Sequence, residues 1–198
     1  MRLWTFQPAD IYETLKKEKV LHTDASKIEM FYFDDEEDIQ SRRAYDYLVS
    51  KMKEKIGMPE SESVQYPWWA WYKFNGKNKQ PDLRRKECWY SEDMVCIELE
   101  LPYEKVLLSD EELWYGPLNN SPIIMEKNDD IWDQKYNEYK NLDETVKQRE
   151  IKKTWDNCFD ISGDMKMYTS GNWIQATFWD LNVNDVKKVR VVKRKSRT

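Results

Sequence analysis

The chain has 198 residues, of which 40% are hydrophobic and 35% charged, and a formal net charge of −5. This length accommodates one domain with a substantial core, and the 10 Trp, 12 Tyr and 6 Phe residues supply the apolar area that disordered chains lack. No apolar run approaches the ~20 residues that span a bilayer, and the N-terminus lacks the apolar core of a signal peptide, so we expect a cytoplasmic protein without a membrane partner.

The N-terminal residues predict a strand followed by a helix. The apolar stretch LWTF (3–6) is typical of a strand, and Pro8 suits the first turn of a helix because the N–H that proline lacks has no partner there. In the segment 9–19, Ile11 and Leu15 are four residues apart and share one helical face. We therefore expect a helix directly after the first strand.

A longer helix is predicted over residues 36–57. Acidic residues lead this segment and lysines end it, an order that the helix dipole favours. Gly57 and Pro59 then end the helix, because glycine readily adopts the conformation found at helix C-termini. Tyr45 lies beside the apolar stripe. The stripe recurs every four residues and consists of Ala44, Leu48, Met52 and Ile56.

The aromatic stretch YPWWAWYKF (66–74) predicts a strand, since Trp and Tyr favour strands and Asn75-Gly76 is a strong turn signal at its end. In a strand, Trp69 and Trp71 share one face and Trp68 shares the other with the remaining aromatic residues. Both faces are therefore aromatic. The pattern fits two interpretations: a strand with one face on the core and one on a pocket, or a strand buried on both sides.

The rest of the chain predicts short strands mixed with helices. Residues 93–101 alternate between apolar and polar side chains, which indicates a half-buried strand. The other predicted elements are a strand at 105–110, a short helix within 111–120, a helical region at 128–161 whose interrupted stripe fits two helices joined near 142–145, and strands at 172–181 and 186–193. This order predicts a single α+β domain over residues 1–186, with a mixed, mostly antiparallel sheet and three to four helices, followed by a basic strand or tail at 187–198.

Several common catalytic and metal-binding patterns are absent from the sequence. It has only five glycines and no glycine-rich phosphate-binding motif. His22 is the single histidine, and the three cysteines include no C-x-x-C pair, so we expect free thiols and no metal site. We interpret His22 as a surface or turn residue. The sequence therefore assigns no catalytic residue.

Four stretches, at 4–7, 66–85, 107–120 and 173–181, combine aromatic side chains with polar groups of fixed geometry. A planar polar ligand needs both, because it stacks on aromatic faces and is oriented by amide or guanidinium groups. We therefore predict an aromatic-walled pocket for a nucleotide or a base-like ligand, with an aromatic core as the alternative. The candidate ligand-binding residues are Trp4, Gln7, Trp69, Trp71, Arg84, Asp110, Trp114, Asn119 and Gln175.

The C-terminal residues favour a different partner. Residues 187–198 hold seven basic side chains and no acidic one, whereas residues 1–186 hold 25 basic and 37 acidic side chains. Such a basic segment suits nucleic acid or an acidic partner, although the acidic body would repel a phosphate backbone. A nucleic-acid-binding module is therefore a second hypothesis, with a solvated, frayed tail as its alternative.

The sequence also resembles a known family. LWTFQP, YPWWAWY, PDLR, the VLLSD-x-x-LW-x-x-x-LN block and IQATFWDL are similar to motifs of a family of bacterial proteins classified as domain of unknown function 3841. The resemblance spans nearly the whole chain, and the motifs are more specific together than singly. It implies a soluble intracellular domain and brings no established activity. The family pattern has histidine where this chain has Tyr115. A catalytic histidine at this position is therefore not expected in this chain.

Two more distant resemblances concern the order of elements and the first motif. The order is similar to that of ADP-ribosyltransferase-like folds, which implies Gln7 near a nicotinamide site, Gln175 where a catalytic glutamate usually stands, and NAD as a candidate cofactor. Because a glutamine cannot act as a carboxylate, such an enzyme would need Glu98, Asp110 or Asp180 in its pocket. The start LWTFQPADIYETLKKEK is similar to the opening of small RNA-binding β-barrel domains of the pseudouridine-synthase-associated type. A likeness of fold does not by itself establish function.

Overall fold

The computed structural model describes residues 1–23, 36–61, 63–83, 93–162 and 169–192. A six-stranded sheet with strand order β5-β6-β3-β1-β4-β8 dominates this part of the chain, and β2 and β7 form a separate two-stranded sheet. The strand pairs recorded within the described ranges are all antiparallel. The α+β prediction is therefore confirmed.

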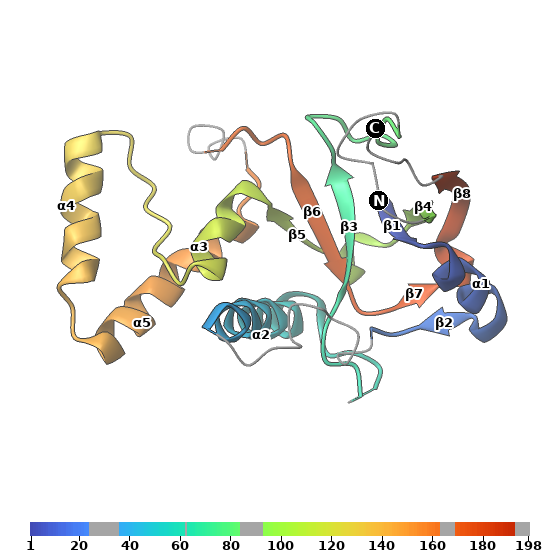
Figure 1. Ribbon diagram of the computed structural model, residues 1–198, viewed down its shortest axis with the longest axis horizontal. Helices are drawn as coiled ribbons and strands as arrows, with labels where there is room; N and C mark the ends of the chain where they lie inside the picture. Colours follow the sequence, from blue (N-terminus) through green and yellow to red (C-terminus); the bar gives the residue numbers. More distant parts are fainter. Residues whose placement is uncertain (24–35, 62, 84–92, 163–168, 193–198) are drawn as a thin grey trace.

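The elements follow the predicted order along the chain (Figure 1). The strands are β1 (Arg2–Pro8), β2 (Val20–Leu21), β3 (Trp68–Lys73), β4 (Met94–Glu100), β5 (Leu107–Asp110), β6 (Ile174–Phe178), β7 (Leu181–Asn182) and β8 (Val186–Val192). The helices are α1 (Ala9–Glu18), α2 (Glu36–Ile56), α3 (Tyr115–Leu118), α4 (Asp129–Lys140) and α5 (Glu144–Thr154). The described ranges thus hold five α-helices where the sequence predicts three to four, because α3 is a single turn and the region 128–161 contains both α4 and α5.

Several element boundaries lie where local sequence chemistry places them. Strand β1 ends at Pro8, which is also the N-cap of α1. Gly57 follows α2 with a φ of +86°, a left-handed conformation that glycine adopts without steric cost. Asn75 and Gly76 after β3 both have positive φ, 52° and 76°, so the chain turns where the Asn-Gly pair predicts a turn.

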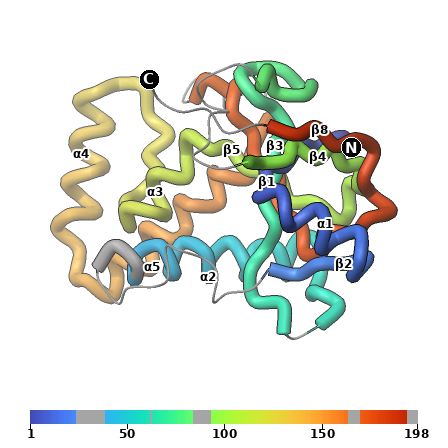
Figure 2. Tube along the Cα trace, turned by 45° about the vertical axis from the view of Figure 1, so that its right-hand side comes forward, coloured from blue at the N-terminus to red at the C-terminus, as the bar shows by residue number. Residues whose placement is uncertain are grey.

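The central strand β3 divides its side chains between the two faces of the sheet. Trp68 and Ala70 belong to the main core, with buried residues of β1, β4, β6 and α1. Trp69 packs instead against a second cluster that contains Trp114 and apolar residues of α2. Helix α1 lies beside β1 and β4, whereas α2 contacts β5 and α3 (Figure 2). The predicted alternation is confirmed from Trp68 to Tyr72, whereas Phe74 lies beyond a register shift and packs against Trp71. The two faces of β3 meet different surroundings.

Helices α4 and α5 extend away from the sheet (Figure 1). Helix α4 has no buried residue, and α5 buries Ile151 in a cluster with Trp155 and Cys158. A short loop joins the two helices where the sequence predicts a break in its apolar stripe. These two helices therefore pack on a small cluster, shared with a residue of α2, that is separate from the core beneath α1.

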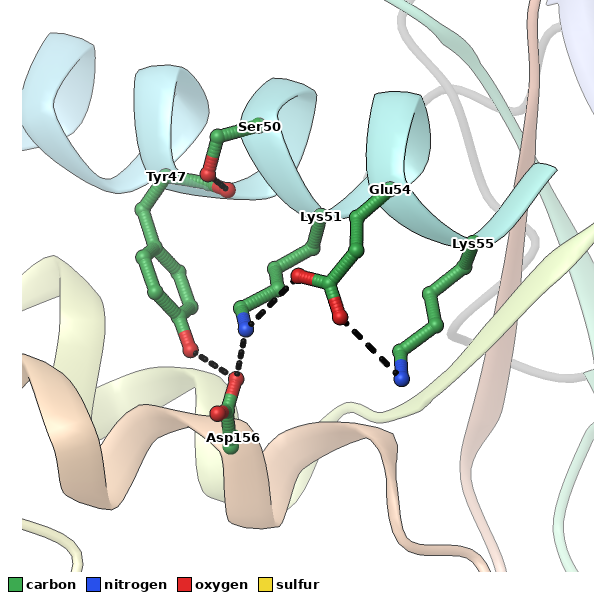
Figure 3. A network of polar contacts seen from close by, with 6 residues as sticks. All are labelled: Tyr47, Ser50, Lys51, Glu54, Lys55 and Asp156. Carbon is green, nitrogen blue, oxygen red and sulfur yellow. Dashed lines mark hydrogen bonds and ion pairs between the residues drawn. The ribbon is translucent and has the colours of Figure 1, made fainter. Parts of the chain in front are cut away.

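A polar network joins α2 to η6 (Trp155–Phe159), the 3₁₀ helix that follows α5 (Figure 3). Tyr47 donates its hydroxyl to Asp156 at 2.6 Å, and Nζ of Lys51 lies 2.7 Å from the same carboxylate. Partial burial raises the pKa of Asp156, but its bonds to Lys51 and Tyr47 outweigh this effect and lower the pKa overall. The network holds α2, which also carries Tyr45, against the η6 segment.

Candidate functional site

Two cavities meet at Tyr45 and Trp69, which line both of them. The larger cavity, about 960 Å³, is lined by the N-terminus of α1, the residues that follow β2 and the start of β3. We call it the α1 cleft. The smaller cavity, about 310 Å³, is lined by side chains from α2, β3, β6 and the segment around α3. We call it the aromatic pocket.

A chain of hydrogen bonds orients the amide of Gln7 in the α1 cleft. Its Nε2 donates to Oγ1 of Thr5 at 2.7 Å, and Thr5 in turn donates to the backbone carbonyl of Trp69 at 2.8 Å. Thr5 is 2% exposed, so this hydroxyl is a fixed part of the fold. Within the described ranges, no residue donates to the amide oxygen of Gln7.

His22 also lines the α1 cleft, directly after β2. Its Nδ1 lies 2.8 Å from Oδ1 of Asp180, a distance that suits an ion pair when the imidazole is protonated, although the contact does not meet hydrogen-bond geometry. The next residue, Thr23, donates its hydroxyl to the carbonyl of Tyr66. These contacts tie the residues after β2 to the segments on either side of them.

The aromatic pocket is built from rings set at steep angles to one another. The Tyr45 and Trp69 centroids are 5.9 Å apart at 63°, and those of Trp69 and Trp114 are 5.9 Å apart at 77°. Trp114 is fixed by a bond from its indole N–H to Oγ of Ser109 at 3.0 Å. Burial raises the pKa of Tyr45 to about 12 against the opposing effect of the Trp69 indole N–H, so its phenol stays neutral at physiological pH.

Three consecutive carboxylates border this region and differ in their partners. Asp110 accepts from the backbone N–H of Glu112 at 2.9 Å and from Oγ1 of Thr169 at 2.7 Å. Glu112 accepts from the backbone and hydroxyl of Ser170. Glu111 lines the aromatic pocket, and its carboxylate forms no hydrogen bond or ion pair within the described ranges. Burial first, and then the charges of Glu112 and Asp110, raise the pKa of Glu111.

Four of the sequence-predicted site residues line the two cavities. Trp69, Trp114 and Gln175 meet in the aromatic pocket, although they come from β3, the end of η5 (Glu112–Trp114) and β6. Gln7 lines the α1 cleft on the other side of Trp69. The predicted combination of aromatic and amide side chains therefore occurs twice, around one shared indole.

Of the other predicted residues, the four that the structure describes line neither cavity. Trp4 is 3% exposed in a small core cluster, and Trp71 packs edge to face against a neighbouring Phe and a neighbouring Trp. Asp110 is 1% exposed and caps the turn after β5. Asn119 is exposed and donates to the carbonyl of the first residue of α3. Arg84 lies outside the described residues.

The residues expected of an NAD-using enzyme lie apart. Gln7 and Gln175 line different cavities. Of the candidate carboxylates, Glu98 lies 3.8 Å from Arg2 on the sheet, Asp110 is committed to its cap, and Asp180 faces His22. Among the described residues, none of these three candidate carboxylates therefore shares a cavity with Gln7 or Gln175.

The basic C-terminal segment begins inside the sheet. Strand β8 pairs with β4 over most of its length, and Nζ of Lys187 lies 3.2 Å from Glu100. Lys188 and Arg190 are partly or fully exposed on this edge strand. The basic residues after position 192 lie outside the described residues.

The sequence missed two residues that shape the cavities. Tyr45 lies one position from the apolar stripe of α2, a placement that marks it as near the core and says nothing about which strand it meets. Glu111 stands between two acidic residues that have local structural roles. No signal in a single sequence separates it from them, because the difference depends on which way each side chain turns in the fold.

The model of a family described as Domain of unknown function (DUF3841) matches residues 2–187. The chain belongs to this family. The DUF3841 match confirms the resemblance carried by the sequence motifs, and it includes the lining of both cavities. No protein of curated function and no solved structure matches the chain significantly.

In the part of the chain that the structure describes, no helix combines the length and the apolar character needed to cross a bilayer. No three His, Cys, Asp or Glu side chains gather there in a group that could hold a metal ion. Cys96 and Cys158 are both buried, and burial raises the pKa of the Cys158 thiol, whereas Cys88 lies outside the described residues.

Proposed function

We propose that this chain binds a planar, base-like ligand, such as a nucleobase or nucleoside, in the α1 cleft. One observation carries the proposal: the amide of Gln7 and the indole of Trp69 line the same cavity of about 960 Å³. This volume lies within the range of small-molecule sites, in which apolar walls surround a few oriented polar groups. Thr5 holds the amide of Gln7 in one orientation before a ligand arrives.

Each part of the cleft has a defined role in this proposal. Trp69 and Tyr45 offer aromatic surface for stacking, which contributes about 1–3 kcal/mol per base. The amide oxygen of Gln7 accepts a hydrogen bond from a ring N–H or an exocyclic amino group of the base. A fixed acceptor of this kind discriminates against ligands that lack the donor, because it would then lose its hydration without a replacement.

The charges of the cleft favour an uncharged base over a polyphosphate. Asp10 and Asp93 both line the cavity, and none of its described lining residues is Lys or Arg. The N-terminus of α1 attracts anions by only about 0.3–1 kcal/mol, and Asp10 already occupies its first turn. A nucleobase or nucleoside is therefore expected to bind more tightly than ATP or NAD, because no Lys or Arg among the described lining residues would neutralise their phosphates.

A ligand panel tests the proposal through tryptophan fluorescence and thermal shift. The panel contains adenine, guanine, uracil, their nucleosides, ATP, GTP, NAD, ADP-ribose and short RNA and DNA. A ligand present at 100 times its Kd stabilises the fold by about 2.7 kcal/mol, which is readily visible in the melting temperature. We expect a shift with a nucleobase or nucleoside. The absence of a shift with every base-bearing ligand would contradict the proposal.

A variant locates the binding within the fold. Gln7→Ala removes the acceptor and is expected to weaken binding of the ligand identified in the panel about tenfold, in line with ~1–1.5 kcal/mol for one hydrogen bond. Gln134→Ala is the matched control, because Gln134 is exposed on α4 and bonds only to Glu138. Equal affinities of the two variants would place the ligand elsewhere.

A further inference from the structure

The aromatic pocket has walls that differ from those of the α1 cleft. Four of its lining side chains are aromatic: Tyr45, Trp69, Trp114 and Tyr115. At about 310 Å³ it lies at the lower end of the range for small-molecule sites. It is therefore suited to a small ligand or to one projecting group of a larger ligand.

The rings of this pocket are arranged edge to face. Trp69 meets Tyr45 at 63° and Trp114 at 77°. A stacked pair hides one face of each ring, as Trp132 and Tyr136 do on α4 at 10°. An edge-to-face contact covers a face of only one of the two rings, so it leaves more ring face uncovered than a stacked pair does. Ring faces carry the negative part of the aromatic quadrupole, which attracts cations.

The pocket also holds one carboxylate without a cationic partner. Glu111 lines it, and none of the described lining residues is Lys, Arg or His. Asp110 and Glu112 flank Glu111 and add to the negative potential, while their own oxygens are occupied by Thr169, Ser170 and backbone N–H groups. A half-buried carboxylate among aromatic rings lacks the charge that would balance it.

We propose that the aromatic pocket binds a small organic cation, an alkylated ammonium group of the kind found in choline or in N-methylated lysine. The ring faces attract its positive charge and Glu111 pairs with it, while the methyl groups fill the apolar space beside Leu118. Alkylation favours this site because the pocket offers one charged acceptor and several rings, which suit a bulky cation better than a strongly hydrated primary amine. This inference does not depend on the base-like ligand of the α1 cleft.

Calorimetric titration of the whole chain with choline and with 3,3-dimethyl-1-butanol tests the proposal. The second molecule has the shape of choline with carbon in place of the charged nitrogen. We expect choline to bind at least tenfold more tightly than this neutral isostere. Equal affinities, or no binding of choline up to high millimolar concentration, would overturn the proposal, since the pocket would then lack selectivity for charge.

Two variants connect the binding to the pocket. Glu111→Gln preserves the size of the side chain and is expected to lower choline affinity at least tenfold, and Tyr115→Ala is expected to lower it at an exposed position that leaves the core intact. Glu104→Gln, on the exposed η4 helix (Tyr103–Lys105), is the matched control and should bind choline as the wild type does. Unchanged affinity in Glu111→Gln would contradict the proposal.

A final arm distinguishes the source of the cation. N-acetyl-trimethyllysine methylamide carries the same head group as choline on a protein-like stem. Tighter binding of this compound would indicate a modified protein side chain, and tighter binding of choline would indicate a free small molecule. Titration of the same variants with the ligand found for the α1 cleft separates the two sites, because Glu111→Gln leaves that cleft intact.

Discussion

The α1 cleft and the aromatic pocket share two side chains, Tyr45 and Trp69, yet they offer opposite chemistry to a ligand. The cleft is wide and is lined by a hydrogen-bonded amide and by the polar N-terminus of a helix. The pocket is small and places one carboxylate among aromatic rings. The difference arises from which element closes each cavity: α1 on one side, and the short α3 segment on the other.

This contrast shows that one aromatic strand can contribute side chains both to the core and to the walls of cavities. Trp68 on β3 is 8% exposed, belongs to the main core and donates its indole N–H to the carbonyl of Leu21, although it also lines the α1 cleft. Trp69, the next residue, is only partly buried and lines both cavities. A strand alternates its faces at every residue, so neighbouring aromatic side chains of one run can divide between the core and the wall shared by two cavities.

The largest expected effect is that of removing the shared indole. Trp69→Ala is expected to abolish measurable binding in both cavities and to lower the free energy of unfolding by about 2–4 kcal/mol, somewhat less than for a fully buried Trp. Trp71→Ala is the control, because Trp71 lies on the same strand and the same face but lines neither cavity. If Trp71→Ala loses both ligands as well, the losses reflect stability and the shared wall is not their cause.

The next prediction uses pH to separate the two cavities. Choline binding requires the charged form of Glu111, whose pKa is raised by burial and by its acidic neighbours. Its affinity should therefore fall as the pH drops through this raised pKa, whereas binding of a neutral base in the α1 cleft should not follow the same curve. Among the described residues, Asp110 and Glu112 act on Glu111 through their charges, and Tyr45 and Tyr115 line the same pocket. A choline affinity that falls identically in Glu111→Gln would assign the effect to these neighbours.

As the pH falls, protonation of Glu111 should increase the free energy of unfolding, whereas it decreases the affinity for choline. A carboxyl group whose pKa is raised in the folded state costs stability while it is charged, and the folded state gains stability as the pH falls and the group takes up its proton. Glu111→Gln is therefore expected to raise the free energy of unfolding at pH 7 by about 0.5–1 kcal/mol, with the gain shrinking toward acid pH. Urea melts at several pH values measure this, and a destabilised variant would indicate an unseen partner of Glu111.

The smallest expected effect concerns a region outside both cavities. The pKa of Asp156 is lowered, so its contribution to stability is complete above the pKa of the unfolded chain and is lost as the pH falls through the folded value. Because its side chain is 58% exposed, Asp156→Asn should cost only about 0.5–1 kcal/mol at pH 7. Asp133→Asn on α4 is the control. A difference that persists in acid would exclude the ion pair with Lys51 as its cause.

Local sequence chemistry predicted much of the fold. Pro8, Gly57 and the pair Asn75-Gly76 mark boundaries because each favours or excludes particular backbone angles, and these preferences act over one or two residues. The alternation of β3 was likewise predictable, since it depends only on the period of a strand. The division of the region 128–161 into α4 and α5 followed from its interrupted apolar stripe.

The site was less predictable because it depends on neighbours across the fold. A pattern of period two assigns Gln7 and Gln175 to faces of a sheet, but it does not reveal that they line different cavities. Tyr45 meets Trp69 only because α2 packs over that face of the sheet. Glu111 differs from Asp110 and Glu112 because their carboxylates accept hydrogen bonds from other segments of the described fold and its own does not. Each of these facts belongs to tertiary packing, which no local preference determines.

The most direct test of this account is one pair of titrations on the wild type and Glu111→Gln, with choline and with the nucleobase or nucleoside that shifts the melting temperature most. The account predicts that Glu111→Gln lowers the affinity for choline at least tenfold and changes the affinity for the base-like ligand by less than twofold. If both ligands weaken together, or neither changes, the two cavities are not separate sites of different chemistry, and the central claim is wrong.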